Sequence, residues 1–365
     1  MQLQGRKYAW TLDFQHFRPI RNFAHKVHLT RYSVLLMAVE LACIDETPIQ
    51  QGGGCNITLN GRGVDFLLDL FQQAGARSSS RGTLQMHEVF PARINLKGPS
   101  VSATLSAIIL TAGRLETTVL HNIALEPEIT ALVSFLKKFG ASISLDTPNR
   151  ILVLDCGRLS FGHTDIFETL IPDRIQFATY AALAVTTRVD LRITNVVPDH
   201  NVSFIKALER IGIEVFALPG TDGLVIRGSD PRKTGMCSNF FKALPYPGLP
   251  TDTLPFLAAI MLSLKQHANI SDAVFPARNH FFKQISRLGF DCTHKLGKIR
   301  IGTSHSPIDS GICEGGDLRS TAALIAVSPL IKSGLTIFNY GQIHRGYNSF
   351  EQWGRIFDLE FALEY

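Results

Sequence analysis

The amino-acid sequence predicts a protein of the α/β (α+β) class, built from repeats of one unit that carries two helices and several strands. Three observations predict this class. Amphipathic helix patterns that stop at a glycine recur along the chain, helices that are apolar on every side alternate with them, and short β-branched segments lie between the two. The chain has 365 residues, which suits two domains of about 150–200 residues each.

The amphipathic helices are predicted to end at glycines that recur at intervals of about 70 residues. Gly75, Gly140, Gly212 and Gly289 each follow a segment such as EITALVSFLKKFGASIS, in which an apolar stripe at helical spacing stops and a strand pattern begins. A glycine just past a helix accepts the left-handed backbone that ends it. A fifth copy, YNSFEQWGRIFDLEF, has Phe357 in the place of the glycine.

The second helix of the unit is apolar on all sides and begins at a polar residue. Its copies read LTRYSVLLMAVELA, GPSVSATLSAIILTAG, IPDRIQFATYAALAV, LPTDTLPFLAAIMLSL and GDLRSTAALIAVSPLIKSG. We expect helices of this composition to be buried. Their N-termini present free N–H groups and the positive end of the helix dipole, which favour anions. The side chains at the five entries are Arg31, Ser100, Arg174, Asp252 and Arg319.

Strand patterns fill the chain between the helices. The segments ILVLDC, VDLRITNV, GLVIRG, IRIGT and LTIFNY are short and rich in β-branched residues, which is typical of strands. The repeat gives about five units, which we divide into a first domain over residues 1–170 and a second domain over residues 171–365. The alternative is that unrelated α/β segments look alike by chance.

Composition and charge exclude several classes of protein. Apolar residues make up 45% of the chain and charged residues 18%, which excludes wholesale disorder. The net charge of +5 without a basic block argues against a nucleic-acid or membrane-surface partner and leaves an anionic small molecule as substrate. The six cysteines form no CxxC pair, so neither a zinc site nor a disulfide framework is expected. Without an apolar signal segment or an apolar run of about 18 residues, the protein is expected to be cytoplasmic.

Six segments in order carry a resemblance to a known family: GGGCNITLNGRGVD, LEPEITALVSFLKKFGA, IPDRIQFATYAALAV, PYPGLPTDTLPF, GGDLRSTAAL and IHRGYNSFEQ. They resemble the enolpyruvyl transferases, and most closely the branch that acts on UDP-N-acetylglucosamine. The resemblance implies an inverted α/β barrel-like fold, in which two domains of repeated βαβαββ units face a cleft with their helix N-termini. It also implies transfer of the enolpyruvyl group from phosphoenolpyruvate to a uridine nucleotide sugar, the first committed step of peptidoglycan synthesis. No metal and no organic cofactor is called for.

The resemblance assigns catalytic roles to two residues. Cys55, in the glycine-rich loop, matches a lid cysteine that donates a proton to the methylene carbon of phosphoenolpyruvate, and a thiol in such a loop can change its protonation as the lid closes. Asp252 matches the aspartate that hydrogen-bonds the attacking hydroxyl and is proposed as its base. Without the resemblance, Asp252 is interpreted as a helix cap. The remaining cysteines are interpreted as free, buried, small hydrophobic residues, namely Cys43, Cys156, Cys237, Cys292 and Cys313.

The resemblance assigns substrate binding to a larger set, much of it at helix entries. A guanidinium suits this role because its planar fork binds carboxylate or phosphate through two hydrogen bonds. Two of these residues have an ordinary alternative, because Asp65 also suits a helix cap and Arg278 also suits a solvated surface position. The implied binding residues are Arg31, Arg62, Val64, Asp65, Ser100, Val101, Val274, Arg278, Asp317, Leu318, Arg319 and Arg345.

The chain departs from the family pattern mainly in its first part. The Lys-Asn pair of the family's first repeat is absent, with Arg21-Asn22 as the nearest dipeptide, so we expect the first repeat to be incomplete or replaced. The Cys55 loop is about two residues longer than usual, and Ser102 stands where a glycine is usual. Three functions therefore stay open: the cell-wall enzyme, a divergent enolpyruvyl transferase acting on another nucleotide such as uridine monophosphate, and a catalytically inactive nucleotide-binding paralogue.

Overall fold

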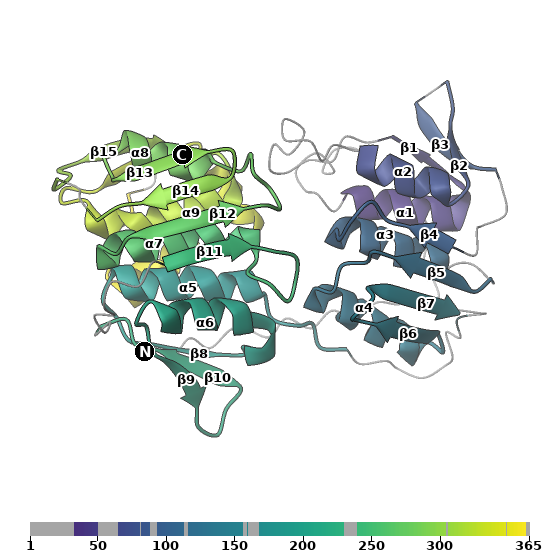
Figure 1. The fold of residues 1–365 in the computed structure, drawn as a ribbon, viewed down its shortest axis with the longest axis horizontal. Coiled ribbons are helices and arrows are strands. Elements are labelled where there is room, and N and C mark those ends of the chain that lie inside the picture. The colour runs from purple at the N-terminus through teal and green to yellow at the C-terminus, as the bar shows by residue number, and fades with distance from the viewer. Residues whose placement is uncertain are drawn as a thin grey trace. The chain divides into compact units, whose positions relative to one another are not determined.

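The computed structural model of the chain is shown in Figure 1, and it divides into two compact units between Ile171 and Pro172. We call the described residues up to Ile171 the N-terminal unit and those from Pro172 onward the C-terminal unit, and we describe each by itself. The described residues are 33–49, 65–80, 82–87, 93–112, 116–155, 159, 168–229, 239–303, 306–347 and 349–362. Within these ranges, no helix combines the length and the apolar character needed to cross a membrane.

One arrangement of helices and strands repeats along the described chain, which confirms the predicted α/β class. Residues 93–155 and 239–301 both follow the order βαβαββ, and their strands lie in the same spatial order, with the fourth strand between the second and third. Residues 33–86 and 174–226 show this order without the first strand, and residues 311–357 show its βαβα part. Because five segments share one topology, the likeness seen in the sequence is structural.

The N-terminal unit consists of four described helices and two sheets. The helices are α1 (Ser33–Ile44), α2 (Asp65–Gln73), α3 (Val101–Ala112) and α4 (Pro127–Lys138). One sheet is antiparallel, in the order β1 (Glu46–Pro48), β3 (Thr83–Met86) and β2 (Ala76–Ser78). In the other, β4 and β5 are parallel, in the order β4 (Arg93–Asn95), β5 (Thr118–His121), β7 (Ile151–Asp155) and β6 (Ser142–Asp146). Helices α1 and α3 pack together in the core of this unit.

The C-terminal unit contains the other three copies of the repeat. Its α-helices are α5 (Arg174–Thr186), α6 (Val202–Arg210), α7 (Leu254–Leu264), α8 (His280–Arg287), α9 (Leu318–Val327) and α10 (Trp353–Phe357). One described sheet has the strand order β8 (Leu191–Thr194), β10 (Gly223–Ile226), β9 (Val215–Leu218). A second has the strand order β11 (Asn239–Ala243), β12 (Ala268–Asp272), β14 (Lys298–Ile301), β13 (Cys292–Lys295). The third sheet is a parallel pair, β15 (Gly311–Glu314) and β16 (Leu335–Phe338).

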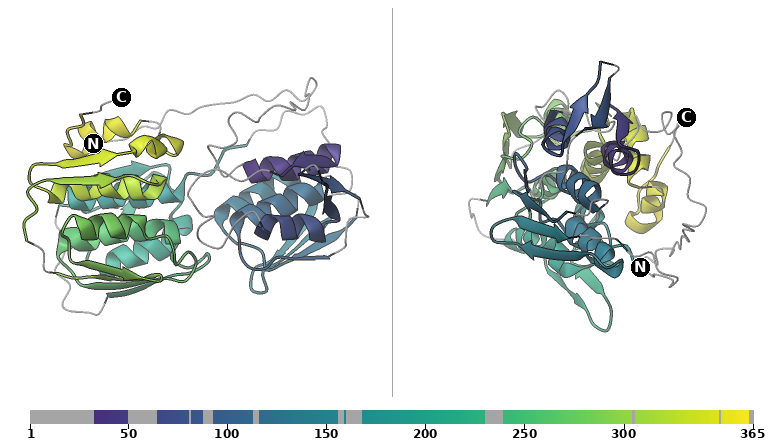
Figure 2. Two further views of the ribbon diagram at one scale, coloured as in Figure 1. Left: turned by 90° about the horizontal axis from the view of Figure 1, so that it is seen from above. Right: turned by 90° about the vertical axis from the view of Figure 1, so that its right-hand side faces the viewer.

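The interior of the C-terminal unit is formed by α5, α7 and α9, which pack against one another. The side chains of α7 are buried at ten of its eleven positions, and those of α9 at eight of ten. The turned view in Figure 2 shows these helices lying against the strands of their own unit. Burying a large apolar side chain contributes about 1.5–3 kcal/mol, so these helices provide much of the stability of the unit. The prediction that the all-apolar helices are buried is confirmed for α5, α7 and α9. It is wrong for α1, which buries one face, Val34, Met37, Ala38 and Leu41, and exposes Ile44 near its end.

The glycines that follow the amphipathic helices have the predicted left-handed backbone. Gly75, Gly140, Gly212 and Gly289 have φ values of 93°, 91°, 90° and 98°. At Gly289 a Cβ atom would meet nothing within 4 Å, so the left-handed conformation, and not lack of space, favours glycine there. In the last copy the left-handed residue is Asp358 (φ 55°), one position after the Phe357 that stands in the glycine's place in the sequence pattern.

Candidate active site

The N-termini of α5, α7 and α9 lie close together and bring three polar entry residues into one cluster. The three helices hold the same place in their copies of the repeat, so their packing brings equivalent ends together. Arg174 is the first residue of α5, and Arg319 is the second residue of α9. Asp252 lies just before α7, and both guanidinium groups are near enough to its carboxyl to lower the pKa of that carboxyl. The structure thus brings together three of the five entry residues that the sequence pattern picks out.

Two of these helices begin with an aspartate that caps their free N–H groups. Asp173 accepts hydrogen bonds from the backbone N–H groups of Ile175 (2.7 Å) and Gln176 (3.3 Å). Asp317 accepts from the backbone of Arg319 and Ser320 (both 2.9 Å) and from the Ser320 hydroxyl (2.8 Å). These caps fix the helix ends and so fix where Arg174 and Arg319 leave the backbone.

Asp252 forms an ion pair with Arg278, and both side chains are partly buried. It lies in a short 3₁₀ turn, Thr251–Thr253, that leads into α7. Arg278 donates through Nη1 to Oδ1 of Asp252, and 16% of the Arg278 side chain and 35% of the Asp252 side chain are exposed. The Arg278 guanidinium also lies 4.8 Å from the centroid of the Phe275 ring. Arg278 is therefore a member of the cluster and not a solvated surface residue.

The charges around Asp252 make it a weak base. Burial alone would raise the pKa of its carboxyl, but Arg278, Arg319 and Arg174 outweigh burial and lower the pKa to about 2. Such a group is ionised at neutral pH but has little affinity for a proton. The arrangement suits acceptance of a hydrogen bond from a substrate hydroxyl better than complete removal of its proton.

A buried chain of hydrogen bonds holds Arg319 in place. Its Nη1 donates to the hydroxyl of Tyr347 (3.0 Å), which lies 2.6 Å from the hydroxyl of Thr179 on α5. Thr179 in turn donates to the carbonyl oxygen of Ile175 (3.1 Å), so each group in the chain can donate to the next. Burial raises the pKa of the Tyr347 phenol, although Arg319 and the Thr179 bond oppose this. Burial would lower the pKa of Arg319, but Tyr347, Asp252 and Asp173 raise it, so the guanidinium stays charged.

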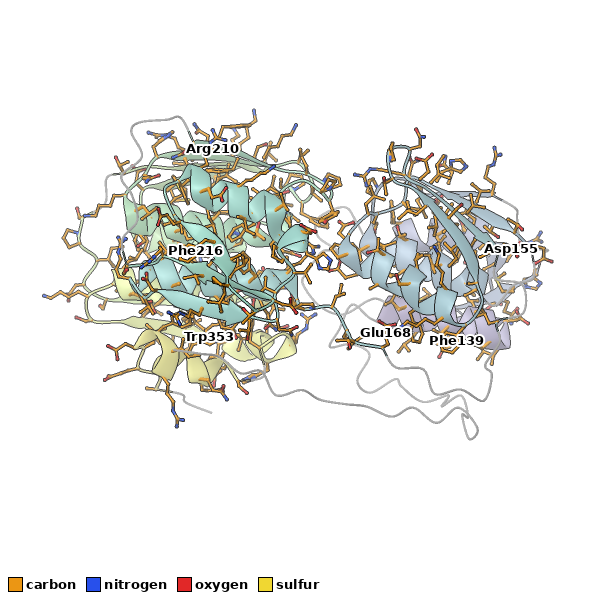
Figure 3. All side chains as sticks on the ribbon, turned by 90° about the horizontal axis from the view of Figure 1, so that it is seen from below. Phe139, Asp155, Glu168, Arg210, Phe216 and Trp353 are labelled. Carbon is orange, nitrogen blue, oxygen red and sulfur yellow. The ribbon has the colours of Figure 1, made fainter. Side chains whose placement is uncertain are left out.

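Tyr347 is a site residue that the sequence pattern did not identify. Its ring lies 5.1 Å from that of Trp353, a 2% exposed side chain labelled in Figure 3, and Tyr347 itself is 4% exposed. The sequence feature that could have identified Tyr347 is its place two residues after Arg345 in the segment IHRGY. Arg345 ends a 3₁₀ turn, and its Nη1 donates a hydrogen bond to Oε1 of Gln342 (3.0 Å). The structure does not bring Arg345 into contact with Asp252.

The other residues that the resemblance assigns lie in different places. Leu318 and Val274 are half-buried, and both pack against the core of the C-terminal unit. In the N-terminal unit, Ser100 immediately precedes α3, and its hydroxyl accepts from the Ala103 N–H (3.5 Å), while Val101 is the first residue of α3. Asp65 is the first residue of α2. The predicted site residues outside the described ranges are Arg31, Cys55, Arg62 and Val64.

The described cysteines divide into two buried thiols and one exposed thiol. Cys292 and Cys313, which we call the two buried thiols, are 4% and 5% exposed, and burial raises the pKa of each to about 12. Cys43 lies near the end of α1 and is exposed, so its interpretation as a buried small hydrophobic residue is wrong. It is one of the last residues of the helix, where the buried face has ended. Cys156 and Cys237 lie outside the described residues.

Comparisons with known proteins identify relatives over most of the chain. The model of the EPSP synthase (3-phosphoshikimate 1-carboxyvinyltransferase) family matches residues 20–353. The UDP-N-acetylglucosamine 1-carboxyvinyltransferase 1 of Caldanaerobacter subterraneus subsp. tengcongensis is 30% identical over 88% of this chain and 75% of its own length. The enzyme of the same name from Clostridium perfringens is 28% identical, again over 88% of this chain and 75% of its own length.

Solved structures show the same fold. The enolpyruvyl transferase NikO from Streptomyces tendae superposes with a TM-score of 0.75 at 23% identity, covering 90% of this chain and 76% of its own. An EPSP synthase from Acinetobacter baumannii gives a TM-score of 0.59 at 15% identity, covering 90% of this chain and 77% of its own. The resemblance carried by the six sequence segments is confirmed. The chain therefore belongs to the EPSP synthase family and is an enolpyruvyl (1-carboxyvinyl) transferase.

Proposed function

We propose that the protein transfers the enolpyruvyl group of phosphoenolpyruvate to the 3-hydroxyl of UDP-N-acetylglucosamine and releases phosphate. The hydroxyl oxygen forms a bond to C2 of phosphoenolpyruvate as its O–H bond breaks and its proton is released to solvent, and the electron pair of the C=C double bond takes up a proton at the methylene carbon. The methylene-derived carbon then gives up a proton as the bond from C2 to the phosphate oxygen breaks, which leaves an enol ether on the sugar. The acceptor is suggested by the names of the relatives that cover most of the chain.

The observation that carries the proposal is the convergence of three guanidinium groups at three helix N-termini. Phosphoenolpyruvate carries a carboxylate and a phosphate, and negative charge builds up on the bridging phosphate oxygen as phosphate leaves. Arg174, Arg278 and Arg319 supply three positive charges, with Asp252, Asp173 and the α9 cap Asp317 as the neighbouring carboxylates. The N-terminal ends of α5, α7 and α9 add the positive ends of their dipoles. Fixed positive groups of this kind stabilise the charge that develops during phosphate departure.

In this proposal Asp252 orients the attacking hydroxyl. Its carboxylate is ionised at neutral pH and is 35% exposed, so a hydroxyl group of an entering substrate can reach it. Because its pKa is about 2, it accepts a hydrogen bond strongly only after a substrate displaces part of its contact with Arg278. Cys55 remains the predicted proton donor to the methylene carbon, on the basis of the family resemblance.

A second candidate function is enolpyruvyl transfer to a different nucleotide, such as uridine monophosphate. The observation that favours it is that Arg21-Asn22 is the nearest match in this sequence to the Lys-Asn pair, which the family resemblance places on both phosphoenolpyruvate and the sugar. The cluster around Asp252 is compatible with either acceptor. In both reactions its proposed ligands are phosphoenolpyruvate and one acceptor hydroxyl group, so it does not itself select the nucleotide.

The test is release of phosphate from phosphoenolpyruvate by the full chain, with product mass, using the two acceptors in parallel. We expect an enolpyruvyl adduct of UDP-N-acetylglucosamine, and a loss of kcat of about a hundredfold in Asp252→Asn. Asp309→Asn is a matched control, because Asp309 is a 76% exposed partner of Lys332 outside the cluster. An adduct on uridine monophosphate alone would select the second function. No adduct with either acceptor would overturn both.

A further inference from the structure

A buried carboxylate outside the predicted site joins the two segments that carry the Asp252–Arg278 pair. Asp272 is the last residue of β12 and is 5% exposed. Its Oδ2 accepts a hydrogen bond from the hydroxyl of Thr251. Its Oδ1 accepts hydrogen bonds from the backbone N–H groups of Val274 (2.9 Å) and Phe275 (2.8 Å). All three partners are donors, which is the set that a carboxylate with two oxygens can satisfy.

The two ends of this bridge lead directly to the ion pair. Thr251 immediately precedes Asp252 in the 3₁₀ turn, and Thr251 is itself 9% exposed. On the other side, the Arg278 N–H donates to the carbonyl oxygen of Phe275 (2.9 Å), which closes the turn that presents the Arg278 guanidinium. The guanidinium rests on the Phe275 ring. One carboxylate therefore holds both the residue before Asp252 and the turn that positions Arg278.

The position of Asp272 is itself tightly fixed by the neighbouring backbone. Its N–H donates to the carbonyl oxygen of Gly297 (2.6 Å). A Cβ atom at Gly297, whose φ is 75°, would lie only 2.4 Å from the Asp272 carbonyl oxygen, so the two backbones meet as closely as glycine allows. The bridge thus starts from a strand end that has little freedom to shift.

We propose that Asp272 is a positioning residue that sets the geometry of the Asp252–Arg278 pair, and through it the way Asp252 meets the acceptor hydroxyl. The inference rests on the proposed function only in the role given to Asp252. A purely stabilising role for a buried, hydrogen-bonded acid is the competing explanation. The two differ in one observable, because a positioning residue changes the charge environment of Asp252 when it is altered, whereas a stabilising residue changes only the free energy of unfolding.

The test is the carboxyl titration of Asp252 in the full chain, followed by NMR with ¹³C-labelled aspartate and assigned with Asp252→Asn. Asp272→Asn leaves one carbonyl oxygen for three donors, and Thr251→Val removes the hydroxyl with little change of shape. With Arg278 less firmly held, we expect the pKa of Asp252 to rise measurably above about 2 in both variants, while Arg174 and Arg319 still keep it below the ordinary value. Thr251→Ser keeps the hydroxyl donor and should restore the low pKa.

The matched control is Asp190→Asn. Asp190 also accepts from a backbone N–H and a hydroxyl, those of Ser229 (3.1 and 2.7 Å), but it has no contact with the cluster. The inference is overturned if the pKa of Asp252 stays at about 2 in folded Asp272→Asn and Thr251→Val, or if it rises equally in Asp190→Asn. A kinetic readout adds a second criterion: kcat should fall about tenfold, with a smaller change in the KM for phosphoenolpyruvate. Failure of the wild type to form product would refute the proposed function but would leave the titration result standing.

Discussion

Replacing Tyr347 by phenylalanine removes one oxygen atom from the centre of the buried chain that holds Arg319. The hydroxyl accepts a hydrogen bond from a guanidinium at 3.0 Å and shares another with Thr179 at 2.6 Å, in surroundings that leave Tyr347 only 4% exposed. A hydrogen bond to a charged group contributes about 1.5–3 kcal/mol and a neutral one about 1 kcal/mol. Thr179 keeps its bond to the Ile175 carbonyl, and phenylalanine no longer has a hydroxyl to bury. We therefore expect the free energy of unfolding to fall by about 2 kcal/mol.

Urea titration of the full chain measures this change, with Tyr340→Phe as the matched control. Tyr340 is partly buried, and among the described residues no hydrogen bond is recorded for its hydroxyl, so its loss should cost less than about 0.5 kcal/mol. Because Arg319 loses its fixed direction, the KM for phosphoenolpyruvate should also rise in Tyr347→Phe, by about tenfold. Equal unfolding free energies for the two variants, or a Tyr347→Phe enzyme with unchanged KM, would refute the role given to this chain of hydrogen bonds.

Three further changes test other parts of the structure. Because the folded-state pKa of Asp252 lies below the ordinary value of 3.8, its ionised form contributes stability above about pH 4 that is lost as the pH falls toward 2. Between pH 7 and pH 3 this loss of unfolding free energy amounts to about 1 kcal/mol, and Arg278→Gln, which leaves Arg174 and Arg319 in place, should reduce it by about 0.5 kcal/mol, as urea titrations at the two pH values would show. Gly289→Ala should lower the free energy of unfolding by about 1 kcal/mol, because alanine is strained at a φ of 98°. Gly98 has as much space around its Cβ position but no positive φ, so Gly98→Ala should change the free energy of unfolding little, and equal losses in the two variants would contradict the conformational explanation. A thiol reagent should modify Cys43 in the native protein and spare the two buried thiols until the chain unfolds, as mass mapping of labelled peptides would show.

The secondary structure could be predicted from the sequence because its causes are local. The positive φ at Gly75, Gly140, Gly212 and Gly289 follows from a helix stripe that ends at each glycine, and the apolar composition of α5, α7 and α9 already requires that they be buried. The copy that lacks the glycine shows the limit of this method, since the left-handed turn moves to Asp358, a residue type that also tolerates it.

The contacts that shape the site could not be predicted, because they join residues far apart in the chain. The bond between Thr179 and Tyr347 spans 168 residues, and no motif links the two. Asp272 has no signature beyond its place at a strand end. The weak basicity of Asp252 depends on Arg174, which lies in another copy of the repeat, so its protonation could not be read from the segment LPTDTLPF alone.

The repeat gives the proposed anion site a form of redundancy. Because the first turns of α5, α7 and α9 are equivalent places that meet at one point, a positive charge supplied by any of the three copies acts on the same ligand. A cation lost from one copy during divergence can thus be replaced by one gained in another, without a change of backbone. Under the proposed function, binding of phosphoenolpyruvate therefore depends on the summed charge at three equivalent helix ends, and sequences that differ at each end can preserve it.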